Sequence, residues 1–492
     1  MANVKDEVRK HYTVTIGIEC HVQLKTNTKL FAAVGNDARD AEPNTLISHI
    51  CMGLPGALPV LNSEAVALAS KAAFALGSKP STFSTFDRKH YFYPDLPLGY
   101  QITQFYQPIV LGGSVEISID GKPKVIHITR AHLEADAGKS SHPSGADYSL
   151  VDLNRAGTPL LEIVSEPEIS SPAEARAYAH ELYLLMKYAD VSDADLYHGN
   201  MRFDVNVSVS KTSELGTRTE TKNLNSFKSV ERAAEYEINR QIELLEKGQA
   251  IVQETRGWDD AKQKTSSQRG KEQAHDYRYM PEPDIPPVAL DGKYIQNIKN
   301  SMPVMPGEWR AKLASLGLNQ SQTDILIDAE VADHTVHYLE ILEASLQSKD
   351  YAKQLANWFV NIEIPFRADQ EQNILLNNDG RTTMYKEVAS LSKEGKLSSS
   401  NAKLLIQELL THEVLPGSIE KYADEQGFIQ VSDTGELDKI VIDVITANPA
   451  AAADVRNGEM KAIGFLVGQV MKASQGKANP GLAQQLLRKH LS

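Results

Sequence analysis

An alternating stretch near the start of the chain most constrains its fold. From Val14 to Leu24, apolar side chains occupy every second position and polar ones the positions between. This is the period-two pattern of a β-strand with one buried face. It places Glu19 and His21 side by side on the polar face, roughly 7 Å apart. A carboxylate beside an imidazole suits a metal ion or a proton transfer, although a solvated strand face with two incidental polar residues has the same pattern.

Strand signals continue through the first part of the chain and nearly vanish after Met305, where helical spacing takes over. A chain of 492 residues is long enough for roughly two to four domains. We therefore predict an α+β protein with three parts: a large mixed-sheet domain (1–303), an all-α helical domain (304–416) and a small all-α tail domain (417–492). The break at Leu415-Pro416-Gly417 marks the second boundary.

Local signals predict how the sheet is built and covered. Ser171-Pro172-Ala173-Glu174 combines a capping box with proline at the first helical position, so a helix should run from there to about Tyr188. A second amphipathic helix should begin at Phe227 and end near Gly248. Asp120-Gly121 predicts a hairpin turn.

Two further stretches carry weaker signals. The polar residues 258–273 are typical of a mobile loop, and one more strand is expected near Tyr294. The aromatic segment 83–106 contains Arg88-Lys89-His90, and it fits either base stacking or an aromatic core.

Carboxylates gather on the predicted strands. Asp204 lies on the polar face of a strand over 201–209, and Glu220 lies on the strand that returns from it. Glu134 and Asp136 have strand spacing and could face one ion together, although two acids near a strand end also fit a turn. Oxygen-rich ligands with at most one imidazole favour magnesium over zinc, and magnesium bridges to phosphates. The predicted metal ligands are Glu19, His21, Glu134, Asp204 and Glu220.

The sequence contains no complete glycine-rich phosphate-binding loop, so a nucleotide would have to be bound in another way. Gly138-Lys139-Ser140 resembles the end of such a loop, but position 133, which needs glycine, is leucine. Cations that could clamp phosphate groups are Arg218, Lys222, Arg256, Arg269 and Arg278. These patterns indicate a metal-dependent phosphoryl-transfer enzyme.

The charge distribution favours a local contact with nucleic acid. The net charge of −13 argues against a general nucleic-acid coat. From residue 461 to the last residue, however, there is no Asp or Glu. A basic terminus of this kind suits contacts with a phosphate backbone, although a solvated helix face has the same composition. The candidate nucleic-acid-contacting residues are Lys461, Lys472, Lys477, Arg488 and Lys489.

The cysteine count and the hydropathy predict a cytoplasmic protein. Cys20 and Cys51 are the only cysteines, which fits a reducing compartment and excludes a disulfide framework. No apolar run approaches the ~18 residues of a membrane span, and the first ten residues are polar, so we expect neither a membrane anchor nor a signal peptide.

Four motifs in order carry a family resemblance. They are 16–24 (IGIECHVQL), 52–62 (MGLPGALPVLN), 86–97 (FDRKHYFYPDLP) and 221–227 (TKNLNSF), and 276–284 (DYRYMPEPD) fits as well. Together they resemble the GatB family, whose members are the B subunits of tRNA-dependent amidotransferases. The resemblance implies that misacylated Glu-tRNA(Gln) or Asp-tRNA(Asn) is amidated with ATP. Ammonia would come from a glutaminase A subunit, and a small C subunit would complete a heterotrimer.

The resemblance also implies roles for particular residues. Glu19, His21 and Glu134 resemble the family's metal ligands, with Asp204 and Glu220 added here for a second ion. The first domain would be a cradle that holds the kinase and transamidase site, and the helical parts would contact tRNA. The predicted catalytic residues are Glu19, Glu134, Lys222 and Arg278. The predicted ATP-binding residues are Arg218, Arg256, Arg269 and Lys271.

One departure from the family pattern concerns zinc. Some members bind structural zinc through a Cys-x-Cys and a Cys-x-x-Cys, but here these stretches read Phe31-Ala32-Ala33-Val34 and Ser48-His49-Ile50-Cys51. With Cys51 alone remaining, we predict ATP and Mg²⁺ as cofactors and no zinc. Loop packing through residues such as Leu46 would take its place.

Two other functions are compatible with part of the sequence. A stand-alone ATP-dependent carboxylate–amine ligase would need the same metal site, and a non-catalytic RNA-binding scaffold would need the same tail. The basic tail favours a tRNA partner over a small molecule. The carboxylate-lined sheet favours an enzyme over a scaffold.

Overall fold

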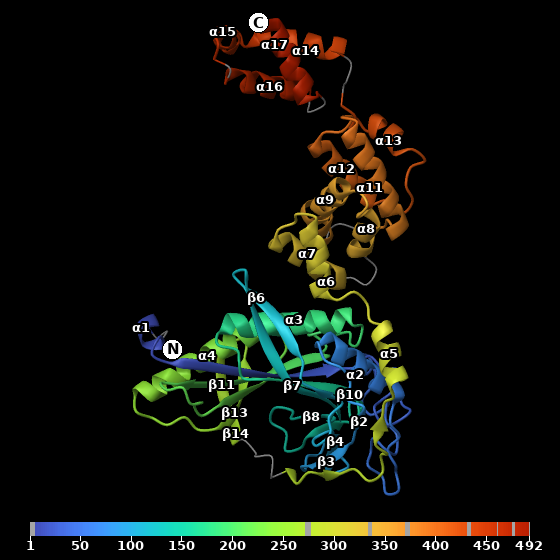
Figure 1. The fold of residues 1–492 in the computed structure, drawn as a ribbon, viewed down its shortest axis with the longest axis vertical. Coiled ribbons are helices and arrows are strands. Elements are labelled where there is room, and N and C mark those ends of the chain that lie inside the picture. Colours follow the sequence, from blue (N-terminus) through green and yellow to red (C-terminus); the bar gives the residue numbers. More distant parts are fainter. Residues whose placement is uncertain are drawn as a thin grey trace. The chain divides into compact units, whose positions relative to one another are not determined.

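The computed structural model describes residues 5–270, 277–332, 337–369, 374–430, 434–459, 461–474 and 478–491 (Figure 1). The chain divides into two compact units, residues 1–308 and 309–492. The first unit is mixed α/β and the second is helical, as expected for an α+β protein. The further boundary at 416/417 stays a prediction. Among the described residues, no helix is long and apolar enough to cross a bilayer.

A nine-stranded sheet forms the centre of the first unit. The alternating stretch is β1 (Thr13–Gln23), which runs between β10 (Pro159–Ser165) and β11 (Met201–Ser210) and is antiparallel to both. Beyond β11 come β12 (Thr219–Leu224), β13 (Glu254–Asp259) and β14 (Lys264–Gly270). Beyond β10 come β7 (Lys122–Ala135) and β5 (Val110–Leu111), and β6 (Ser114–Ile119) also pairs with β7.

Two helices cover one face of this sheet. α3 (Pro172–Tyr188) lies over β6, α4 (Phe227–Glu246) lies over β11, and the two helices contact each other (Figure 1). The predicted start of α3 is confirmed, since Ser171 Oγ accepts the backbone N–H of Glu174 at 3.2 Å. The apolar side chains of β1, Cys20 among them, are buried in one core with these helices. The polar side chains of β1 therefore face the other way.

Two expectations from the sequence are wrong. Residues 258–270 are not a loop, because β13 and β14 form an antiparallel pair and β13 runs parallel to β12. The strands were not recognised because their composition is polar. On the buried face, Arg256 and Thr265 contact Glu237 of α4 where apolar side chains would normally alternate. The strand expected near Tyr294 is helix α5 (Gly292–Asn300), whose N-cap Asp291 accepts the N–H of Tyr294. Residues 271–273 of the expected loop lie outside the described residues.

Smaller elements complete the first unit. They are helices α1 (Asp6–Arg9) and α2 (Ser63–Ala75) and strands β2 (Phe83–Ser84), β3 (Asp87–His90), β4 (Tyr100–Thr103), β8 (Lys139–Ser141), β9 (Leu150–Asp152), β15 (Met280–Pro281) and β16 (Val288–Ala289). β3 lies between β4 and β15 in a three-stranded sheet, and β4 contacts β7. The segment with Arg88-Lys89-His90 is thereby brought close to the central sheet.

The second unit is built from helices throughout its described residues. From the end of the first unit onward, the helices are α6 (Pro306–Ser315), α7 (Gln320–Ala332), α8 (Tyr338–Ser345), α9 (Lys349–Trp358), α10 (Ile364–Ala368), α11 (Asn378–Lys393), α12 (Ser399–Leu410), α13 (Ile419–Glu425), α14 (Thr434–Ala447), α15 (Pro449–Arg456), α16 (Ala462–Ala473) and α17 (Pro480–Leu491). A π-helical turn, Phe359–Glu363, joins α9 to α10. Helices α14 to α17 share one apolar core.

Candidate metal and catalytic centre

The polar face of β1 carries a first group of three carboxylates. Glu19 lies opposite Asp204 of β11 in the strand register, and Asn206 lies opposite Glu220 of β12. One oxygen from each of Glu19, Asp204 and Glu220 lies within 4.8 Å of the others. Asn206 Nδ2 donates a hydrogen bond of 3.0 Å to Glu19 Oε1, which holds that carboxylate over the sheet. The sheet therefore brings together the three acids that the sequence assigned to separate strands.

A second group surrounds His21. Donor atoms of His21, Glu134 and Glu162 lie within 4.8 Å of one another. His21 Nε2 is 3.9 Å from Glu134 Oε1 and 3.7 Å from Glu162 Oε2. Glu162, which was not predicted from the sequence, lies opposite His21 in the β1–β10 register. The sequence feature that could have identified Glu162 is that it is the single charged residue in the otherwise mostly apolar strand PLLEIVS.

Lys222 balances the first group. Its Nζ lies 3.1 Å from Asp204 Oδ2 and 3.5 Å from Glu220 Oε1. Burial would lower the pKa of Lys222, but Asp204, Glu220 and Glu19 outweigh it and raise that pKa. Burial would likewise raise the pKa of Asp204, but Lys222, His21 and the N–H of Asn223 hold it below its ordinary value. Asn223 takes a left-handed conformation (φ 60°) and its N–H donates to Asp204 Oδ1 at 2.8 Å.

His132 and Lys89 balance the second group, and sequence reasoning missed both roles. His132 Nε2 is 3.3 Å from Glu162 Oε2 and 3.8 Å from Glu134 Oε2. Burial would lower the pKa of His132, but the two carboxylates raise it to about 9. They also raise the pKa of Lys89 against the effect of burial. Burial and Glu162 would raise the pKa of Glu134, but His132, Lys89 and His21 hold it below its ordinary value.

The donor set fits hard divalent cations. Five carboxylates and one imidazole supply the two groups, and Mg²⁺ prefers oxygen ligands of this kind. Glu134, Asp204 and Glu220 are each less than a twentieth exposed. Buried carboxylates this close together require compensating positive charge, which an ion in each group would supply together with Lys222, Lys89 and His132.

Comparison with known proteins connects this geometry to a family. A model of the GatB/GatE catalytic domain matches residues 14–296, and a model described as GatB domain matches residues 340–491. The chain belongs to the GatB family. It is 42% identical to the B subunit of the aspartyl/glutamyl-tRNA(Asn/Gln) amidotransferase of Carboxydothermus hydrogenoformans, over 98% of this chain and 99% of the relative. The protein of the same name from Moorella thermoacetica is 43% identical, over 98% of this chain and all of the relative. Both donor groups of this GatB-family chain lie inside the matched catalytic domain.

Of the cations predicted to clamp phosphates, Arg256 does not face this site. It lies opposite Thr221 in the register, and Thr221 lies opposite the apolar Val205. Its side chain therefore points to the helix face, where Nε lies 3.0 Å from Glu237 Oε1. The ATP contact predicted for Arg256 is incompatible with this placement, because the guanidinium is buried on the wrong side of the sheet.

The structure neither places the other predicted ATP-binding cations in the site nor excludes them from it. Arg218 is exposed and precedes β12 by one residue. Arg278 is exposed, with its guanidinium carbon 5.9 Å from the centre of the Phe92 ring and a left-handed backbone (φ 44°). Lys271 and the side chain of Arg269 lie outside the described residues. Their predicted roles stay predictions.

Asp136 does not share an ion with Glu134. β7 ends at Ala135, and the next side chain turns toward two arginines, with Arg155 Nε and Arg202 Nη2 each 3.2 Å from Asp136 Oδ2. Asp136 therefore belongs to an ion-pair cluster beside the metal groups.

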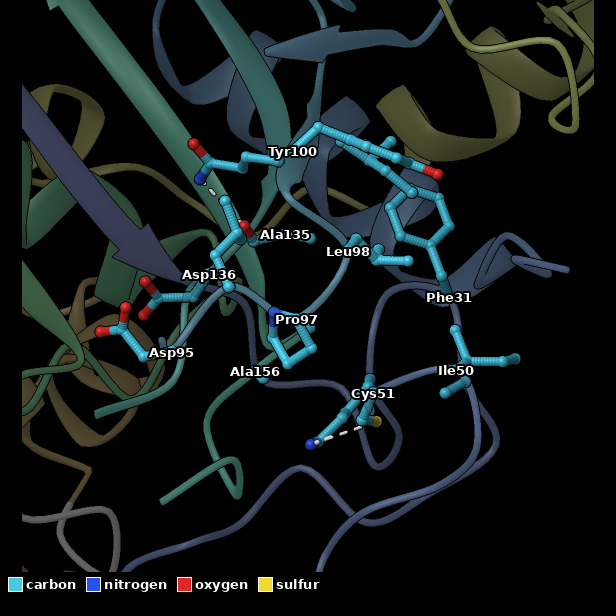
Figure 2. A pocket seen from close by; sticks show the side chains of 16 residues that line it. Phe31, Ile50, Cys51, Asp95, Pro97, Leu98, Tyr100, Ala135, Asp136 and Ala156 are labelled. Atoms are coloured by element: carbon cyan, nitrogen blue, oxygen red, sulfur yellow. Dashed lines mark hydrogen bonds between the residues drawn. The ribbon is translucent and has the colours of Figure 1, made fainter. Parts of the chain in front are cut away.

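Neither cysteine lies in the metal site. Burial raises the pKa of the Cys20 thiol well above its ordinary value. Cys51 lines a pocket of about 50 Å³ together with Ala135 and Asp136 (Figure 2). Its Sγ lies 3.5 Å from Lys29 Nζ and 3.5 Å from Ser48 Oγ.

The basic tail residues lie mainly at helix ends. Lys461 precedes α16, Lys472 lies in its last turn, and Arg488 and Lys489 lie in the last turn of α17. Positive charge near a helix C-terminus also stabilises the helix dipole, so this placement has a structural explanation as well. Lys477 lies outside the described residues. The tRNA contact stays a prediction.

Proposed function

We propose that this chain is the ATP-dependent GatB component of a tRNA-dependent amidotransferase, which converts Glu-tRNA(Gln) or Asp-tRNA(Asn) to Gln-tRNA(Gln) or Asn-tRNA(Asn). The observation that carries the proposal is the pair of three-donor groups built around Glu19 and His21 on one strand face. The names of the full-length relatives support the same reaction.

The reaction needs two displacements. The side-chain carboxylate of the aminoacyl ester attacks the γ-phosphorus of ATP, ADP leaves, and an acyl phosphate forms. Ammonia then attacks the acyl carbon, loses a proton and expels inorganic phosphate, which leaves the amide. Magnesium bound at the two donor groups would neutralise charge on the phosphates.

The chain's own residues prepare this site. Glu19, Asp204 and Glu220 would hold one ion and His21, Glu134 and Glu162 the other. Lys222 forms ion pairs with Asp204 and Glu220 that hold both carboxylates in position, and Lys89 adds positive charge at the second group. Such preorganised charge in a partly buried site stabilises a phosphoryl-transfer transition state more than the same charge in water.

Partner subunits follow from the chemistry. Cys20 is buried in the sheet core. Among the described residues, no histidine hydrogen-bonds Cys51, so neither thiol has the Cys–His pairing of a cysteine glutaminase nucleophile. Ammonia would therefore come from the A subunit, with a C subunit completing a heterotrimer and the basic tail contacting tRNA. We expect this assembly in the cytoplasm, with ATP and Mg²⁺ as cofactors and no structural zinc.

The test is a Glu19→Gln variant in the assembled enzyme, supplied with Glu-tRNA(Gln), glutamine, ATP and Mg²⁺. We expect tRNA-dependent ATP hydrolysis and amide formation to fall by about 100-fold or more, because a ligand of the ion is lost. Glutaminase activity and tRNA affinity should stay near wild type. The matched control is Glu116→Gln on the exposed face of β6, which should have no effect. A wild-type enzyme without tRNA-dependent turnover would refute the proposal.

A further inference from the structure

Arg202, which lies beside the metal groups, makes a single hydrogen bond to another described residue. Arg202 of β11 lies directly opposite His21 in the register, on the polar face of the sheet. Its side chain is 20% exposed, and its Nη2 donates one hydrogen bond, to Asp136 Oδ2 at 3.2 Å. Within the described ranges, the other N–H groups of this guanidinium meet no acceptor.

Asp136 orients Arg202 but does not neutralise the local charge. The same oxygen of Asp136 faces Arg155 Nε at 3.2 Å, so one carboxylate serves two guanidinium groups. Arg155 is fixed in turn, because it donates to the carbonyl oxygens of Ala137 at 3.0 Å and Gly138 at 2.6 Å. The cluster keeps one net positive charge, and Arg202 is its member next to His21.

The nearby acids do not explain this charge. Glu134 and Glu162 instead pair with His132, whose Nε2 lies 3.8 Å from Glu134 Oε2 and 3.3 Å from Glu162 Oε2, and no hydrogen bond or ion pair between described residues joins the two acids to Arg202. Residues opposite each other in antiparallel strands have Cβ atoms about 4.5–5.5 Å apart. The guanidinium of Arg202 is therefore within reach of a ligand bound at His21, and its remaining N–H groups can donate hydrogen bonds to two oxygens of one anion.

We propose that Arg202 is a substrate-binding residue that holds an oxyanion of the reaction beside the His21 metal group. The anion is either the side-chain carboxylate of the aminoacyl ester or a phosphate of ATP. This inference rests on the proposed function. Holding the anion by a planar, two-point contact fixes the attacking and accepting groups relative to each other, which lowers the barrier by orientation.

The test compares Arg202→Gln and Arg202→Lys with wild type in the assembled enzyme. The measurements are kcat, the KM for Glu-tRNA(Gln), the KM for ATP and the thermal unfolding temperature. We expect Arg202→Gln to raise one KM by about 10- to 100-fold, the range for losing hydrogen bonds to a charged group. Arg202→Lys should recover only part of the loss, because an ammonium cannot make the two-point contact. A change in the KM for Glu-tRNA(Gln) assigns the carboxylate, and a change in the KM for ATP assigns the phosphate.

The control is Arg176→Gln, an exposed arginine on α3 that pairs with Glu231 on the opposite face of the sheet. It should leave all four measurements near wild type. If both KM values stay at wild type in Arg202→Gln, whatever happens to kcat and the unfolding temperature, the guanidinium does not bind the anion and the inference is overturned. Failure of the proposed function would differ, since wild type itself would then show no tRNA-dependent turnover.

Discussion

Replacing Lys222 with methionine tests whether the first acid group is an ion site. Lys222 Nζ lies 3.1 Å from Asp204 Oδ2 and 3.5 Å from Glu220 Oε1, and both acids are almost fully buried. Methionine keeps the length of the side chain but removes its charge. Two buried carboxylates, with Glu19 close by, then lose the ammonium that offsets their repulsion.

The cost follows from the geometry. At an effective dielectric constant of about 20, each of the two contacts contributes about 5 kcal/mol of Coulomb energy. Desolvation cancels much of this, and breaking a buried ion pair costs about 3–5 kcal/mol net. The Lys222 side chain is 30% exposed, so water screens the pair in part, and we expect a cost at the lower end of the range of about 3–5 kcal/mol. The free energy of unfolding should therefore fall by about 3 kcal/mol without metal.

Magnesium should reverse this loss if Glu19, Asp204 and Glu220 bind it. Ligand at 100 times its Kd stabilises the folded state by about 2.7 kcal/mol, which is close to the expected cost. The assay is urea unfolding of the full chain with and without excess Mg²⁺. The matched control is Lys124→Met, since Lys124 pairs with Glu174 at 2.7 Å and is 32% exposed but contacts neither donor group. The reasoning is refuted if Mg²⁺ fails to stabilise Lys222→Met, or if Lys222→Met loses no more stability than the control without metal.

Three further predictions address other parts of the chain. Glu162→Gln should raise the Mg²⁺ concentration for half-maximal ATP hydrolysis by about 10- to 100-fold, and an unchanged Mg²⁺ titration would remove Glu162 from the site. Burial would raise the pKa of Glu237, but Arg240, Thr265 and Arg256 hold it below its ordinary value of 4.5. This carboxylate therefore stabilises the fold above about pH 4.5 and loses that effect as the pH falls through its folded pKa. Glu237→Gln should cost about 3 kcal/mol at neutral pH and less in acid, and urea titrations with a constant difference across pH would contradict this. The pair Arg488→Gln and Lys489→Gln should weaken tRNA binding and lower the slope of log K against log salt by about 1–2, and an identical slope in filter binding would count against the tail contact.

Much of the architecture follows from local sequence patterns. The alternation of β1 separates Cys20 from Glu19 and His21, and the structure confirms both faces. The capped start at Ser171-Pro172 and the helical run after Met305 are confirmed as well. These features are decided within a few residues by side-chain spacing and capping, so they can be recognised without tertiary contacts.

Only the tertiary structure decides which side chains meet. Glu162 joins His21 because β10 pairs with β1 in one particular register, across 141 positions of sequence. Arg256 turns away from the site because β13 pairs with β12 in a register that puts it opposite Thr221, which itself lies opposite the apolar Val205. A shift of one residue moves a side chain to the other face of a sheet, and no local pattern encodes it.

The sequence by itself thus determined the fold class, the family and the strand that carries Glu19 and His21. The tertiary structure decided the second donor group, the burial of Arg256 against α4 and the placement of Arg202 opposite His21. The physical reason is that burial periodicity acts along the chain, whereas the charges of a site are balanced across strands by residues far apart in sequence. The residues next to a charged side chain in a polar segment do not show which distant residue it will contact. Its role can be recognised only once the sheet brings the two residues together.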